Sequence, residues 1–131
     1  MEHLSLRRKI ALDIVSKLHE EEVEKHELHQ LFWECTLRCN LACRHCGSDC
    51  RVQSLVKDMP VADFCKALDS VAKVYDPHKV LVIITGGEPL VRKDLEACGR
   101  AIYDRGFPWS IVTHGLALTP ERYKSLLGNG L

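Results

Sequence analysis

The chain has 131 residues, of which 46% are hydrophobic, and its 18 basic side chains balance 18 acidic ones. This length and composition suit one globular domain and argue against a disordered chain. The balanced charge supplies no overall field that would attract nucleic acid or an anionic membrane, so neither is expected as a partner. No apolar run approaches the roughly 20 residues of a membrane span, and no apolar signal core follows the charged start at residues 1–9, so we expect a cytoplasmic protein.

The first segment, residues 6–28, carries apolar side chains at helical spacing among charged ones. This pattern predicts an amphipathic helix, and such helices usually pack on the core that follows them. A helix that binds a specific partner is the alternative. We therefore expect residues 1–28 to form a helical extension ahead of a core domain at residues 29–131. The apolar positions are Leu6, Ile10, Ile14, Val15, Leu18 and Val23.

The rest of the chain alternates between strand and helix patterns. Residues 80–84 form an unbroken apolar, mostly β-branched run, typical of a strand buried on both faces of a parallel sheet. Ahead of one helix, Asp58 is suited to the cap and Pro60 to the first turn. The predicted elements are a strand at 31–34, a helix from 61 to about 74, a strand at 80–84, a helix at 94–105, a strand at 109–113 and a helix beginning at 119–121.

This β-α-β-α-β-α order predicts a parallel sheet with right-handed crossovers, helices on its outer face and ligands at the carboxyl ends of the strands. Residues 128–131 form a turn with no strand after it, so we expect the chain to stop in the middle of a fold. The third strand would then have an unpaired edge. We expect the 131 residues alone to have little or no activity.

A cluster of cysteines follows the first predicted strand. Cys39, Cys43 and Cys46 lie within eight residues, so one loop can turn three sulfurs toward a common point. A 4Fe-4S cube is commonly held by four cysteines, so three would leave one iron open to a non-protein ligand. The remaining cysteines are interpreted as structural or incidental, because free cysteine behaves as a small core residue. They are Cys35, Cys50, Cys65 and Cys98.

Two other interpretations of this segment stay open. Its five cysteines and His45 include enough ligands for a structural zinc site, although only one pair has the C-x2-C spacing. The five cysteines also share one helical face, as core residues would, although Asn40 and the turn at 47–49 suit a helix interior poorly. A non-catalytic zinc-binding or interaction module is therefore the rival from another functional class.

The segment after the second predicted strand reads Thr85, Gly86, Gly87, Glu88, Pro89. Two glycines let the backbone approach a ligand closely. The turn lacks the Gly-x-Gly-x-x-Gly pattern of dinucleotide sites and the Lys-Ser/Thr of a P-loop, so by itself it is an ordinary strand-to-helix turn. After the third strand, the sequence Thr113, His114, Gly115 offers side chains that can form hydrogen bonds.

Together these motifs resemble the radical S-adenosylmethionine (SAM) superfamily. The C-x3-C-x2-C set is similar to its signature, in which three cysteines bind a 4Fe-4S cluster and SAM chelates the fourth iron. Residues 86–89 resemble the "GGEP" motif that binds the SAM ammonium group, with Glu88 as a negative charge beside it. His45 stands where many members carry an aromatic residue near the adenine. Thr113 and His114 resemble part of a Thr-Asn-Gly sequence, so they are expected near SAM or substrate.

The resemblance implies both a fold and a reaction. The fold is the N-terminal half of a partial (β/α)6 TIM-like barrel. A flavodoxin- or ferredoxin-like electron donor would reduce the cluster, and SAM would split into methionine and a 5'-deoxyadenosyl radical that takes hydrogen from the substrate.

The sequence also resembles particular branches of the superfamily. Residues 31–50 are most similar to the SPASM-type branch of peptide and protein maturases and are also similar to a branch found with partner lipoproteins. A peptide or protein substrate is therefore expected. A cyclase that makes molybdenum-cofactor precursors and an inactive cluster-binding remnant stay open as alternatives.

Overall fold

The computed structural model describes residues 5–131. The start of the chain through residue 4, including His3, lies outside the described residues. Strands and helices follow one another in the predicted order, which confirms the α/β fold class. The elements are α1 (Leu6–Lys25), β1 (Gln30–Thr36), α2 (Val61–Val71), β2 (Leu81–Gly86), α3 (Leu95–Tyr103), β3 (Trp109–Ile111) and α4 (Pro120–Gly128), with 3-10 turns at Pro77–Lys79 and Pro89–Val91.

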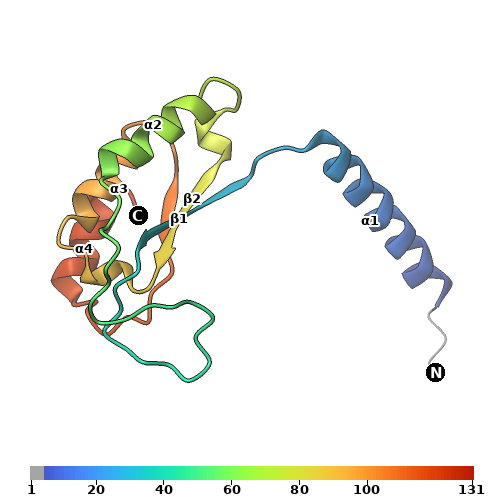
Figure 1. Ribbon diagram of the computed structural model, residues 1–131. Coiled ribbons are helices and arrows are strands. Elements are labelled where there is room, and N and C mark those ends of the chain that lie inside the picture. Colours follow the sequence, from blue (N-terminus) through green and yellow to red (C-terminus); the bar gives the residue numbers. More distant parts are fainter. Residues whose placement is uncertain (1–4) are drawn as a thin grey trace.

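The three strands form one parallel sheet in the order β1-β2-β3. Helices α2, α3 and α4 lie together on one face of it, and among residues 5–131 no helix covers the other face (Figure 1). Along β2, Val82 and Ile84 point toward the helices and are buried, whereas Leu81 and Ile83 are half-buried. The expectation that this strand is buried on both faces is therefore wrong for the second face, because no described element covers it.

The core lies between the sheet and the three helices. The Trp33 ring of β1 stacks on Phe64 of α2 with 4.3 Å between ring centroids. Each helix contributes fully buried side chains to this core, such as Leu68 from α2, Ile102 from α3 and Leu126 from α4. Burial of aliphatic side chains of this size stabilises the fold by about 1.5–3 kcal/mol each. The core thus fixes the sheet whose strand ends carry the motifs.

The start of α2 differs from the prediction. The helix begins at Val61, with Pro60 in the N-cap position and no side-chain cap. Asp58 does not cap it. The Asp58 carboxylate instead accepts a hydrogen bond of 2.7 Å from the Thr36 hydroxyl and forms an ion pair with Arg38. These bonds lower the pKa of Asp58. They also link the end of the loop at residues 37–60, called the cysteine loop below, to the end of β1.

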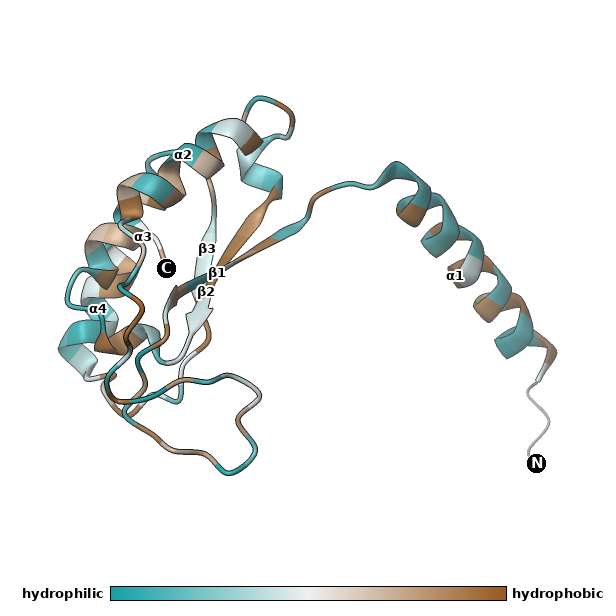
Figure 2. Ribbon diagram, in the orientation of Figure 1, coloured by the Kyte–Doolittle hydropathy of each residue, from teal (hydrophilic) through white to brown (hydrophobic). Residues whose placement is uncertain are grey.

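Helix α1 is confirmed as a helix, and it ends where His26 adopts a left-handed conformation (φ 47°). It has no buried residue and extends away from the sheet and its helices (Figure 1). The expectation that it packs on the core is therefore wrong. Figure 2 shows apolar bands among the polar residues of this helix. Within residues 5–131, no helix combines the length and apolar character that crossing a bilayer would require.

Candidate functional site

The candidate site lies where the three strands end, because parallel strands place their carboxyl ends at one edge of the sheet. The cysteine loop follows β1 and the glycine turn follows β2. Two backbone hydrogen bonds connect the two segments. Gly87 N–H donates to the Thr36 carbonyl at 2.8 Å, and Glu88 N–H donates to the Arg38 carbonyl at 2.9 Å. Residue 38 immediately precedes the first motif cysteine, so the two motifs predicted from sequence are neighbours in space.

Both glycines of the turn are required by this close contact. Gly86 has φ 130°, and a Cβ there would overlap the backbone of Thr36. A Cβ at Gly87 would overlap the Arg38 carbonyl group and come within 3.1 Å of the Cys39 Cβ. The glycines thus let the turn lie against the start of the cysteine motif. This contact within the chain explains why glycine occupies both positions, in addition to the predicted close approach of a ligand.

Glu88 lies under the turn, with its side chain 1% exposed. One carboxylate oxygen accepts hydrogen bonds from Leu90 N–H at 2.9 Å and the Thr113 hydroxyl at 2.7 Å. The other accepts from His114 N–H at 3.0 Å. Such bonds offset the cost of burying the charge, and here they join the end of β2 to the loop after β3. That Glu88 also meets the ammonium group of SAM stays a prediction.

His114 links the ends of all three strands. Its Nε2 lies 2.8 Å from Asn40 Oδ1 and 3.1 Å from the Glu88 carboxylate. Leu116 N–H donates to Nδ1 at 3.2 Å, so Nδ1 is an acceptor and the proton lies on Nε2. Sequence reasoning placed Thr113 and His114 near a ligand, and the structure brings both to Glu88.

Sequence reasoning missed Asn40 as a site residue. Its position within the C-x3-C spacing, next to Cys39, was the available signal. Its contact with His114 brings the loop after β3 to the cysteine motif. The strand ends thus form one hydrogen-bonded group with the motif loop.

The three motif cysteines are free thiols in an irregular loop. Cys39 is half-buried and its N–H donates to the Arg51 carbonyl at 2.8 Å, whereas Cys43 and Cys46 are exposed. In the described part of the chain, no three His, Cys, Asp or Glu side chains are gathered as a metal site. Three free thiols are nevertheless the type of ligand that binds an iron-sulfur cluster. Their role as ligands, and that of exposed His45 near adenine, stays a prediction.

A buried arginine holds the base of the cysteine loop, and sequence reasoning did not find it. Arg92 is 3% exposed, and one of its nitrogens donates to the carbonyls of Cys35 at 2.6 Å and Met59 at 3.1 Å. Its guanidinium also pairs with Asp94 at 2.8 Å, and this bond lowers the pKa of the Asp94 carboxyl. Arg92 thus connects the end of β1 and the last residues of the cysteine loop to the segment that follows the glycine turn.

The cysteines outside the motif have other surroundings. Cys35, Cys65 and Cys98 are buried, in agreement with their interpretation as structural, and Cys50 is half-buried. Burial raises the pKa of both Cys35 and Cys98 to about 12. Burial also raises the pKa values of Cys50 and Cys65. The two groups of thiols should therefore differ in reactivity, because the thiolate is the nucleophile.

We expect iodoacetamide at pH 8 to modify Cys43 and Cys46 in the folded protein and to spare Cys35 and Cys98. The raised pKa keeps the latter two protonated at this pH, and burial denies access to the reagent. Peptide mass spectrometry after timed labelling measures the rates, with a urea-unfolded sample as the control in which all seven cysteines react. Early labelling of Cys35 in the folded sample would contradict the described burial.

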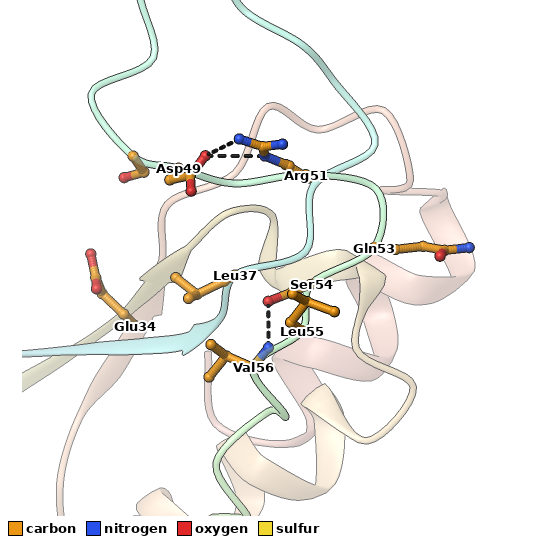
Figure 3. Close-up of a pocket in the computed structure, with 9 residues that line it drawn as sticks. Glu34, Leu37, Asp49, Arg51, Gln53, Ser54, Leu55 and Val56 are labelled. Carbon is orange, nitrogen blue, oxygen red and sulfur yellow. Dashed lines mark hydrogen bonds and ion pairs between the residues drawn. The ribbon is translucent and has the colours of Figure 1, made fainter.

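A cavity of about 700 Å³ lies beside the site (Figure 3). The end of β1 forms one wall and the outer part of the cysteine loop forms the other. Asp49 accepts hydrogen bonds from Arg51 at 3.0 and 3.1 Å across its rim. None of the three motif cysteines lines it. Its lining residues are Glu34, Leu37, Ser48, Asp49, Arg51, Gln53, Ser54, Leu55 and Val56.

The parallel sheet, its helices on one face and the cysteine and glycine motifs at adjacent strand ends are the features expected of a radical SAM core. The family model described as "Radical SAM superfamily" matches residues 33–131, and the chain belongs to this superfamily. The superfamily prediction is confirmed. Members of the superfamily use a 4Fe-4S cluster and SAM.

Similar proteins include enzymes with different substrates. The AdoMet-dependent heme synthase of Nitratidesulfovibrio vulgaris is 27% identical over 99 residues, which are 76% of this chain and 26% of that protein. The PqqA peptide cyclase of Ruegeria pomeroyi is 32% identical over 98 residues, which are 75% of this chain and 25% of that protein. This chain thus spans about a quarter of the length of these relatives.

A solved structure agrees with the fold. The crystal structure of Streptococcus suis SuiB bound to S-adenosylmethionine matches with a TM-score of 0.59 and 20% identity, over 96% of this chain and 29% of that chain. At this identity the similarity concerns the fold alone. It confirms the prediction of an α/β fragment that corresponds to part of a TIM-like radical SAM barrel.

Proposed function

We propose that this chain is the cluster- and SAM-binding front part of a radical SAM enzyme, with Cys39, Cys43 and Cys46 as the cluster ligands. The observation that carries the proposal is the direct hydrogen bonding between the cysteine loop and the glycine turn, from Glu88 N–H to the Arg38 carbonyl. It makes neighbours of two motifs that are 40 residues or more apart in the sequence.

The residues of the chain have separate tasks in this proposal. The three cysteines hold the cluster, and Gly86 and Gly87 leave the backbone accessible beside Cys39. Glu88 and His114 keep the three strand ends together through their mutual hydrogen bonds. When bound, the cluster and SAM supply an electron and a 5'-deoxyadenosyl radical for hydrogen abstraction. No side chain of the site is assigned as a general acid or base.

We further propose a peptide or protein substrate for the whole enzyme, because the similar proteins include a PqqA peptide cyclase. A tetrapyrrole substrate is the second candidate, because they also include heme synthases. A flavodoxin- or ferredoxin-like protein is the proposed electron donor. A reducing cytoplasm would keep the exposed thiols Cys43 and Cys46 available for the cluster.

Anaerobic iron-sulfur reconstitution tests this function. We expect about four irons per chain and a low-temperature EPR spectrum of the reduced sample that changes when SAM is added, because one iron has no protein ligand. Iron and zinc are measured on the same sample. Tightly bound zinc with no reducible cluster would overturn the proposal in favour of the zinc module.

A further inference from the structure

Helix α1 is the one α-helix of the described chain without a buried residue, and its stability therefore requires explanation. A single helix is marginal in water, and most helices in proteins are stabilised by packing of an apolar face. Ile10, Ile14 and Leu18 follow one another at four-residue spacing and are 50%, 55% and 57% exposed. They form an apolar stripe from the second to the fourth turn, and nothing in the described chain covers it.

The charges of α1 are divided between its two ends. Residues 6–15 contain three cations and one anion, a net charge of +2, whereas residues 16–25 contain two cations and four anions, a net charge of −2. The first turn has no acidic residue. Apart from Lys25 in the last turn, this distribution opposes the helix dipole, which favours anions at the N-terminus and cations at the C-terminus. The isolated helix is therefore destabilised by its own charges.

We propose that α1 pairs with α1 of a second copy of this chain in an antiparallel orientation. This orientation sets the basic half of each helix against the acidic half of the other. It also brings the acidic last turns of one copy to the N-terminus of its partner, where negative charge is favourable for the helix dipole. The same charges that destabilise the single helix then stabilise the pair.

The register of the pair follows from the sequence. With about 100° of rotation per residue, an antiparallel pair centred on Ile14 sets each Ile14 against its copy and Ile10 against Leu18. Arg7 and Glu21 each lie seven residues from this centre and within about 20° of it around the helix axis. Each Arg7 therefore faces a Glu21 at both ends of the apolar contact. This self-complementarity is what a two-fold interface requires.

The contact is small, because each copy contributes only a few apolar side chains. We expect a weak dimer whose population depends on protein concentration. Sedimentation or light scattering on the reduced full chain measures it, with helix content from circular dichroism. Ile14→Glu should leave the protein monomeric, because it places a charge at the centre of the contact. Leu12→Glu is the matched control, since Leu12 is also exposed but lies on the opposite side of the helix.

Charge reversal tests the orientation. Arg7→Glu and Glu21→Arg should each weaken the dimer on the order of tenfold, because each creates two repulsive pairs, and the double variant should restore it. A parallel pair would set like residues together in the wild type and in each variant, so neither single reversal would weaken it. A monomeric wild-type chain at all concentrations, an undisturbed dimer in Ile14→Glu, or no recovery in the double variant would overturn the proposal. These outcomes do not depend on cluster binding.

Discussion

Cys43→Ser is expected to lower the iron recovered after anaerobic reconstitution from about four atoms per chain to nearly none. A serine hydroxyl is a much weaker iron ligand than a thiolate, and a set of two cysteines would not hold a cubane cluster. Cys43 is exposed, so the substitution should leave the fold intact. Iron and sulfide analysis with the visible absorption of the cluster measures the effect, and circular dichroism verifies the fold.

Cys50→Ser is the matched control for this prediction. Cys50 belongs to the same irregular loop and lies four residues after Cys46, but it falls outside the C-x3-C-x2-C spacing. Burial raises its pKa, which makes it a poorer thiolate donor. The control should retain its iron. Equal iron loss in both variants would show that the spacing does not define the ligands. Full iron content in Cys43→Ser would show that Cys43 is not a cluster ligand.

The order of strands and helices could be predicted because it depends on local patterns. The apolar run at residues 80–84 gives most of β2, and Thr119 with Pro120 marks the start of α4, where the Thr119 hydroxyl accepts a hydrogen bond from Arg122 N–H. The proximity of the cysteine and glycine motifs could be predicted for the same reason. Their residue types and spacings are local, and parallel strands then bring their ends to one edge of the sheet.

Features that depend on distant partners could not be predicted. Asp58 has the residue type and position of a helix cap, but its partners Thr36 and Arg38 lie at the other end of a long loop. Arg92 carries no local sign that it will reach the Cys35 carbonyl, 57 residues earlier. The exposure of α1 also could not be predicted, because an apolar stripe does not specify whether it meets its own core, a second copy or nothing.

Gly87→Ala is expected to lower the free energy of unfolding by about 1–3 kcal/mol, because overfilling a closely packed contact forces atoms apart. The added Cβ would overlap the Arg38 carbonyl group and approach the Cys39 Cβ to 3.1 Å. These are mostly backbone atoms, so rotation of a side chain cannot relieve the overlap. Urea unfolding followed by circular dichroism measures the change.

Gly47→Ala is the control, because it makes the same substitution in the cysteine loop where a Cβ would meet no atom within 4 Å. Its effect should stay within about 0.5 kcal/mol. Reconstitution of both variants then separates stability from site geometry. Under folding conditions, Gly87→Ala should bind less iron than Gly47→Ala, because the start of the cysteine motif must move away from the turn. Equal stability and equal iron in the two variants would mean that the contact of Gly87 with residues 38 and 39 does not position the motif.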